Sequence, residues 1–164
     1  MILRRRQGTS GLRPIDLCPE DGNEESLVAN VSRWLERDIK VVTIPLPVGL
    51  SGVWTSTDSQ ELIALDAASS ELRRRVALCH ELAHMVLGHG DADREGDDEP
   101  ELDLLRGALP DLDPRLIKQA LFRSGCNLGN PIQEREAEAY ATRLFSHLEG
   151  ARRAHANLRH NRFN

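Results

Sequence analysis

The chain has 164 residues, of which 40% are apolar, and a formal net charge of −5. This length and composition suit one globular domain with its own core, not a disordered chain or a fibre. No apolar run approaches the roughly 20 residues of a membrane span, and the basic N-terminus lacks the apolar stretch of a secretory signal. Three scattered cysteines without a CxxC pair exclude a disulfide framework. We therefore expect a protein of the reducing cytoplasm, and the acidic balance argues against a dedicated nucleic-acid binder.

The charges divide the chain into segments. Residues 1–22 show little periodicity and predict a loose N-terminal arm, and arginines make residues 151–164 a basic C-terminal tail. Between them we expect one folded domain over residues 23–150. Residues 91–103 contain eight acidic residues against one arginine. We interpret this acidic stretch as a solvated loop, with docking of a basic partner as the alternative.

The first predicted element is a helix over residues 24–38, where apolar residues recur at helical spacing. Residues 40–46 are rich in β-branched side chains and end at prolines, which indicates a strand. Residues 52–57 and 61–66 flank a polar turn and predict a β-hairpin. The three strands should form a small, mostly antiparallel sheet.

The clearest helix covers residues 71–88. Ser70 stands where an N-cap belongs, and Gly88 fits a C-terminal stop. An apolar stripe along this helix should face the core; it contains Leu72, Val76, Cys79, Ala83 and Val86. We expect Cys79 to be a buried, unreactive core residue.

Three more helices are expected towards the C-terminus, over residues 101–108, 113–124 and 131–149. The last is the strongest, because Asn130 can cap it and Pro131 suits its first position. Helices outnumber strands and do not alternate with them. The sequence therefore predicts an α+β fold, a mainly helical single domain with a small three-stranded sheet.

The motif His80-Glu81-Leu82-Ala83-His84 is HExxH and lies inside the clearest helix. Residues four apart project from one face of a helix, so two imidazoles can converge on one zinc ion (Zn²⁺). Glu81 follows the first histidine directly, so its carboxylate lies beside the metal and can accept a proton from an attacking water. The alternative is a pair of histidines on a helix flank without a metal.

A catalytic zinc site needs a third protein ligand. His89 is close but one residue out of register with the HExxHxxGxxH pattern. Glu134, on the last helix, is the better candidate, and Glu138 one turn later could accept the outer N–H of a zinc-bound imidazole. Glu136 should point away from the metal, since it lies roughly 200° round the helix from Glu134. A solvated acidic helix face is the alternative for this cluster.

The segment CHELAHMVLGH, followed some fifty residues later by EREAEAYATRLF, resembles the ImmA/IrrE family of zinc metallopeptidases. The similarity covers roughly residues 24–148 and is to a short branch from GC-rich bacteria. It implies that Glu134 is the third ligand beside His80 and His84, with Tyr140-Ala141 in place of Phe-Ala. Glu138 departs from the Asn or Asp of many members. The implied activity is limited proteolysis of a transcriptional repressor, often one encoded nearby.

The functional hypothesis is a zinc-dependent endopeptidase with Glu81 as general base. The expected partner is a helix-turn-helix repressor, with no membrane and no direct nucleic-acid binding. Tyr140 or His147 could stabilise the oxyanion, and an exposed strand edge could hold an extended peptide. The alternative is a catalytically silent, zinc-bound protein that acts by binding a regulator. A regulator that contacts DNA through its basic ends is disfavoured by the net charge.

Overall fold

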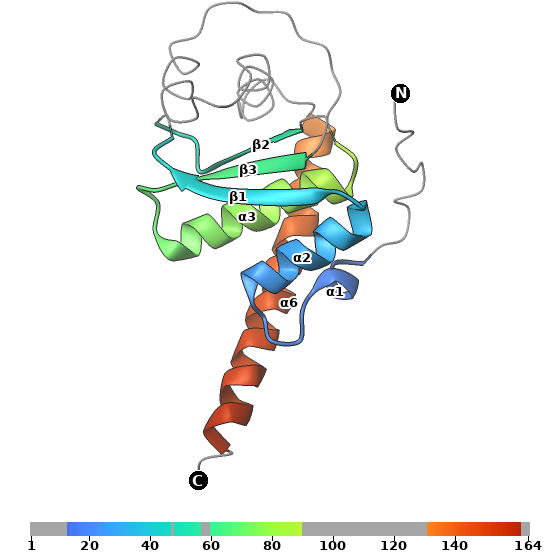
Figure 1. Cartoon of the computed structure of the whole chain (residues 1–164), viewed down its shortest axis with the longest axis vertical. Helices are drawn as coiled ribbons and strands as arrows, with labels where there is room; N and C mark the ends of the chain where they lie inside the picture. Colours follow the sequence, from blue (N-terminus) through green and yellow to red (C-terminus); the bar gives the residue numbers. More distant parts are fainter. Residues whose placement is uncertain (1–12, 47, 57–59, 90–130, 162–164) are drawn as a thin grey trace, which may run out of the picture.

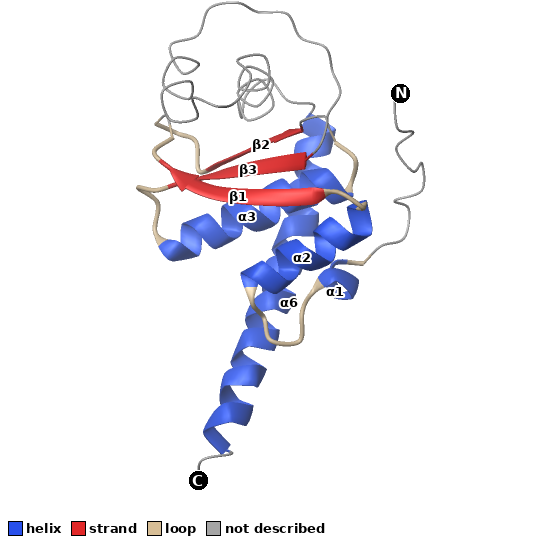
Figure 2. Ribbon diagram, viewed as in Figure 1, coloured by secondary structure: helices blue, strands red, loops and turns tan. Residues whose placement is uncertain are grey.

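The computed structural model describes residues 13–46, 48–56, 60–89 and 131–161. These residues form helices packed on a small sheet, which confirms the α+β prediction (Figures 1 and 2). In chain order the elements are α1 (Pro14–Leu17), α2 (Glu24–Leu35), β1 (Asp38–Ile44), β2 (Gly52–Ser56), β3 (Gln60–Asp66), α3 (Glu71–Val86) and α6 (Pro131–Asn161). The acidic stretch 91–103 and the helices expected over 101–108 and 113–124 lie outside the described residues. No helix in the described part of the chain is long and apolar enough to span a membrane.

The sheet has the strand order β1-β3-β2. β2 and β3 pair antiparallel, as the predicted hairpin requires. β1 pairs with β3 in parallel, so the sheet is mixed and the antiparallel expectation holds only for the hairpin. The reason is the strand order. β3 lies between β1 and β2, so β1 pairs with β3 instead of with its neighbour in sequence, β2. β3 runs in the same direction as β1, which makes this pair parallel. β1 and β2 are consequently the two edges of the described sheet.

The core lies where the sheet, α2, α3 and α6 pack together, and α2 contributes the fully buried Leu27 and Val31. α3 contacts β2 and β3 as well as α6, so most of its surface is covered. Its buried apolar residues are Ala77, Leu78, Cys79, Leu82, Ala83, Met85 and Val86. The predicted stripe was therefore wrong at its N-terminal end, because Leu72 is 58% exposed and Val76 46% exposed. These two side chains lie at four-residue spacing in line with His80, on the face of α3 that carries the histidine.

The N-terminal arm is partly packed. Within residues 1–22, Pro14–Leu17 form the single helical turn α1, and Leu17 is a buried member of the core. The prediction of a loose arm is therefore wrong for these residues. One turn is too short to show a hydrophobic period, so periodicity does not predict this helix.

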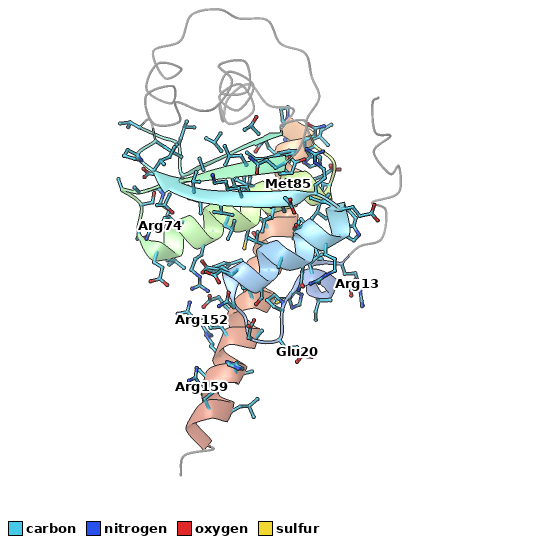
Figure 3. All side chains as sticks on the ribbon, viewed as in Figure 1. Arg13, Glu20, Arg74, Met85, Arg152 and Arg159 are labelled. Atoms are coloured by element: carbon cyan, nitrogen blue, oxygen red, sulfur yellow. The ribbon has the colours of Figure 1, made fainter. Side chains whose placement is uncertain are left out.

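The last helix continues beyond the predicted end at residue 149 through Asn161. Residues 152–159 are exposed, so the basic tail is solvated as expected, but it is helical (Figure 3). Gly22 adopts a left-handed φ of +64°, and a Cβ there would lie 2.3 Å from the backbone nitrogen of Arg152. Glycine at this position therefore lets the start of the extension lie against the loop before α2, and the rest of α6 projects beyond the other described elements (Figure 1).

A buried arginine joins three of the helices. Arg75 on α3 forms ion pairs with Glu24 of α2 and Glu149 of α6, and its guanidinium lies 5.8 Å from the ring centroid of Phe145. The arginine side chain is only 6% exposed. Removing one partner of a buried ion pair typically costs several kcal/mol. The cluster therefore links the N-terminal half of α3 to α2 and to the middle of α6.

Candidate metal centre

The two histidines of the motif meet on the open face of α3. Ser70 caps this helix by accepting a hydrogen bond from the Arg73 amide, as predicted, and the helix runs unbroken through the motif. The Nε2 atoms of His80 and His84 lie 3.0 Å apart, with the rings edge to face. The His80 side chain is 32% exposed and that of His84 13%. Both rings are thus held by the helix while their Nε2 atoms converge on one point.

Glu134, in the first turn of α6, completes the cluster. One carboxylate oxygen lies 3.4 Å from His80 Nε2, and the other lies 3.5 Å from His84 Nε2. Among the described residues these three form the one group of potential ligands whose donor atoms lie within 4.8 Å of one another. With zinc–ligand distances near 2.0–2.1 Å, tetrahedral ligand atoms stand about 3.3 Å apart. The observed separations of 3.0, 3.4 and 3.5 Å therefore fit three ligands of one tetrahedral zinc ion.

The carboxylate of Glu81 is buried beside this cluster, and the residue is 9% exposed. Burial raises the pKa of Glu81 to about 8, and the neighbouring charge of Glu134 adds to the rise. The space for the side chain depends on Gly52 at the start of β2, where a Cβ would stand 3.2 Å from Glu81 Oε1 and 3.3 Å from its Cγ. This pKa is that of the metal-free protein, and the positive charge of a zinc ion beside Glu81 would favour the ionised carboxylate, the form in which a general base accepts a proton.

His89, weighed from the sequence as a possible third ligand, contacts the other side of His84. Its Nδ1 lies 3.2 Å from His84 Nδ1, and its Nε2 lies 3.2 Å from Glu136 Oε2. His89 is 5% exposed. Burial lowers the pKa of His84 to about 3, and the two neighbouring histidines contribute. His84 is therefore a neutral imidazole, the form that binds a metal.

The remaining sequence candidates lie away from the ligand cluster. Glu138 is exposed, and no hydrogen bond or ion pair joins it to another described residue, so the position expected for it is taken by His89 and Glu136. The Tyr140 hydroxyl is buried without a hydrogen-bond partner among the described residues. Burial raises the pKa of Tyr140 to about 12, and the charge of Asp16 on α1 adds to the rise. His147 is exposed, about 20 Å along α6 from Glu134. Neither is placed to stabilise an oxyanion at the ligand cluster.

Cys79 precedes the first histidine and is buried, as predicted. It is 1% exposed, and burial raises the pKa of its thiol to about 12. Such a thiol stays protonated and packs as a small apolar group, because only the thiolate is a good nucleophile or metal ligand. The cysteine therefore belongs to the core and not to the metal cluster.

Comparison with known proteins identifies one domain. Residues 36–105 match the family model Peptidase_M78, described as the IrrE N-terminal-like domain. This confirms the predicted resemblance to the ImmA/IrrE family. The matched range includes His80, Glu81 and His84 but ends before Glu134, so the association of Glu134 with the histidines rests on the packing of α6 in the structure. No curated protein and no solved structure matches the chain.

Proposed function

We propose that this chain, which belongs through its residues 36–105 to the Peptidase_M78 family of IrrE N-terminal-like domains, is a zinc-dependent endopeptidase. The observation that carries the proposal is the triangle of donor atoms from His80, His84 and Glu134, whose three sides fit one tetrahedral ion. A site closed by a fourth protein ligand would be structural, whereas three protein ligands leave a position for water or substrate. Among the residues that the structure describes, these three alone reach the cluster, and such an arrangement supports catalysis.

The residues divide the work of peptide hydrolysis between them. His80, His84 and Glu134 would hold the zinc ion, which supplies a Lewis acid for activating water and polarising a carbonyl. Glu81 would accept the proton of the attacking water as its oxygen forms a bond to the carbonyl carbon. When the carbon–nitrogen bond breaks, Glu81 would pass this proton to the departing amine. The position of Glu81, buried beside the ligand cluster, suits both transfers, and a bound zinc ion would favour the ionised carboxylate that accepts the proton.

The surroundings of the site suit an extended peptide. β2 is an edge of the described sheet, and Gly52 at its start lies next to Glu81. A peptide segment can add to such an edge through main-chain hydrogen bonds. Leu72 and Val76 expose apolar surface in line with His80 on α3, where substrate side chains could be covered. These features support a polypeptide substrate.

The substrate we propose is a helix-turn-helix repressor encoded near this protein, cleaved at a limited number of positions in the cytoplasm. The test is co-expression of this chain with that repressor, followed by the size of the repressor and by repression of a reporter gene. Wild-type protein should shorten the repressor and relieve repression. Glu81→Gln should bind zinc but leave the repressor intact, and Glu138→Gln, a matched change on an exposed surface, should behave as wild type.

The same experiment separates catalysis from binding. Relief of repression by Glu81→Gln to the wild-type extent, with no shortened repressor in either case, would replace the peptidase by a zinc-bound protein that acts by binding. Cleavage of an unrelated unfolded protein, with the repressor untouched, would keep the peptidase and reject this substrate.

A further inference from the structure

The end of α3 is built so that it returns the chain over the second histidine. Gly88 has a left-handed φ of +68°. Its amide donates to the carbonyl of Met85, and the amide of His89 donates to the carbonyl of His84 at 2.9 Å. This pair of bonds is the Schellman motif, in which the second residue beyond the helix commonly makes an apolar contact with the residue five positions earlier. Here that contact joins two imidazoles.

The imidazole of His89 bridges His84 and α6. Its ring centroid lies 5.2 Å from that of His84 at an interplanar angle of 68°, and the facing Nδ1 atoms are 3.2 Å apart. The opposite nitrogen, Nε2, lies 3.2 Å from a carboxylate oxygen of Glu136. The His89 side chain is 7% exposed, whereas that of Glu136 is 59% exposed. The chain of contacts therefore runs from the metal cluster to the surface of α6.

We propose that His89 and Glu136 are positioning residues that hold His84 in the tautomer and ring orientation needed to bind zinc. This inference rests on the metal site of the proposed function. When His84 Nε2 faces the metal, the proton of its neutral ring resides on Nδ1, which donates to Nδ1 of His89. His89 then carries its own proton on Nε2 and donates it to Glu136.

Alternative partners for His84 are limited by geometry. Glu138 would be the expected acceptor from sequence spacing, but it is exposed on α6 and has no hydrogen bond to a described residue. His89, by contrast, is fixed by the backbone of the helix end, so its ring needs little further ordering to meet His84. Groups that orient metal-bound imidazoles in this way typically change metal affinity or activity by 10–100-fold when they are removed.

The test is the zinc dissociation constant of the full chain, measured by competition with a chromophoric chelator and without any substrate. His89→Ala should weaken zinc binding about 10–100-fold. Glu136→Ala should weaken it less, by about tenfold, because its carboxylate is largely solvated. Glu138→Ala removes the same charge from the same helix two residues on, and it should bind zinc as the wild type does.

A second measurement distinguishes positioning from a general loss of structure. His89→Asn places an amide oxygen near the former Nδ1 and should recover part of the affinity lost in His89→Ala. Cobalt bound in place of zinc should show an altered visible spectrum in His89→Ala and an unaltered one in Glu138→Ala. If His89→Ala does not fold, Glu136→Ala, at an exposed position, carries the same test.

Wild-type affinity in both His89→Ala and Glu136→Ala would overturn the inference, and so would equal losses in Glu136→Ala and Glu138→Ala. A wild-type protein that binds no zinc would overturn both this inference and the proposed metal site. If zinc binding responds to these variants as expected but no repressor is cleaved, the positioning role stands and only the proposed peptidase activity fails.

Discussion

Replacing Glu81 with glutamine should stabilise the metal-free protein, although it should abolish peptidase activity. The reason is the burial of the carboxyl group next to Glu134, which raises its pKa from 4.5 to about 8. Between these two pH values the unfolded chain releases a proton that the folded protein retains. The stability of the wild-type protein therefore falls as pH rises through this window, because the unfolded state binds fewer protons than the folded one.

The size of the effect follows from the pKa difference. Each pH unit above 4.5 costs the folded state about 1.4 kcal/mol until the pH approaches 8. The cost is about 3 kcal/mol at pH 7 and below about 1 kcal/mol at pH 5. Glutamine stays neutral throughout, but its buried amide has a desolvation cost of its own. We therefore expect Glu81→Gln to gain about 1–3 kcal/mol at pH 7 and almost nothing at pH 5.

The assay is denaturant unfolding in the presence of a chelator at both pH values, followed by tryptophan fluorescence, to which the buried Trp54 and the partly buried Trp34 contribute. His84 acts in the opposite direction, since its lowered pKa makes stability rise with pH between about 3 and 6.5, but this contribution is common to both proteins and cancels. Glu138→Gln is the exposed control and should show no pH-dependent gain. A stability difference between Glu81→Gln and wild type that is the same at pH 5 and pH 7 would refute the reasoning.

Three further predictions concern the ligand, the thiol and the helix end. Glu134→Ala removes one of three ligands and should lower zinc affinity by orders of magnitude, so stoichiometric zinc after dialysis against a chelator would contradict the site. A thiol reagent should label Cys18, which is partly exposed, well before the buried Cys79, whose labelling should follow global unfolding. Gly88→Ala should cost about 1–2 kcal/mol in an unfolding titration because of its left-handed backbone, and should weaken zinc binding by displacing His89, while Gly88→Asn should do less of both. Equal zinc affinity of these two variants would argue against the role of the turn.

Local signals made much of the fold predictable. The helix that carries HExxH has a capping serine, a terminal glycine and a helical spacing of histidines, each of which acts within a few residues. The hairpin β2–β3 is likewise specified by its turn. By contrast, β1 could pair with either strand of the hairpin. Its parallel pairing with β3 depends on packing between distant segments, and no local pattern encodes that choice. The exposed Leu72 and Val76 were misplaced for a similar reason, because periodicity alone does not tell which of two apolar arcs faces the core.

Some residues of the metal cluster could be predicted from the sequence, and others depend on the packing of the helices. The two histidines and Glu81 follow from spacing on one helix. Glu134 was a candidate from the acidic cluster on the last helix, with the solvated face as the alternative, and the family resemblance supported it. Its place depends on how α6 packs. The contact of His89 with His84 has a signal in the sequence. Gly88 was identified as a helix stop, and in a Schellman ending the next residue folds back over the last turn. His89 is the residue after Gly88, so this ending places it against His84.

The cluster depends on how closely α6 approaches α3. Ala137 and Ala141, one and two turns after Glu134 on the same face, are buried against the core, and Leu144 and Leu148 continue this face. Small side chains next to the ligand let the two helix backbones come close enough for a carboxylate on α6 to reach imidazoles on α3. Further along, the larger Leu144 and Leu148 pack in the same core, and Glu149 pairs with Arg75 of α3. The first turns of α6 thus set the distances at the metal cluster, and the later turns, from Leu144 to Glu149, anchor the helix to the core. A substitution in the later turns therefore need not alter the distances between the ligand atoms.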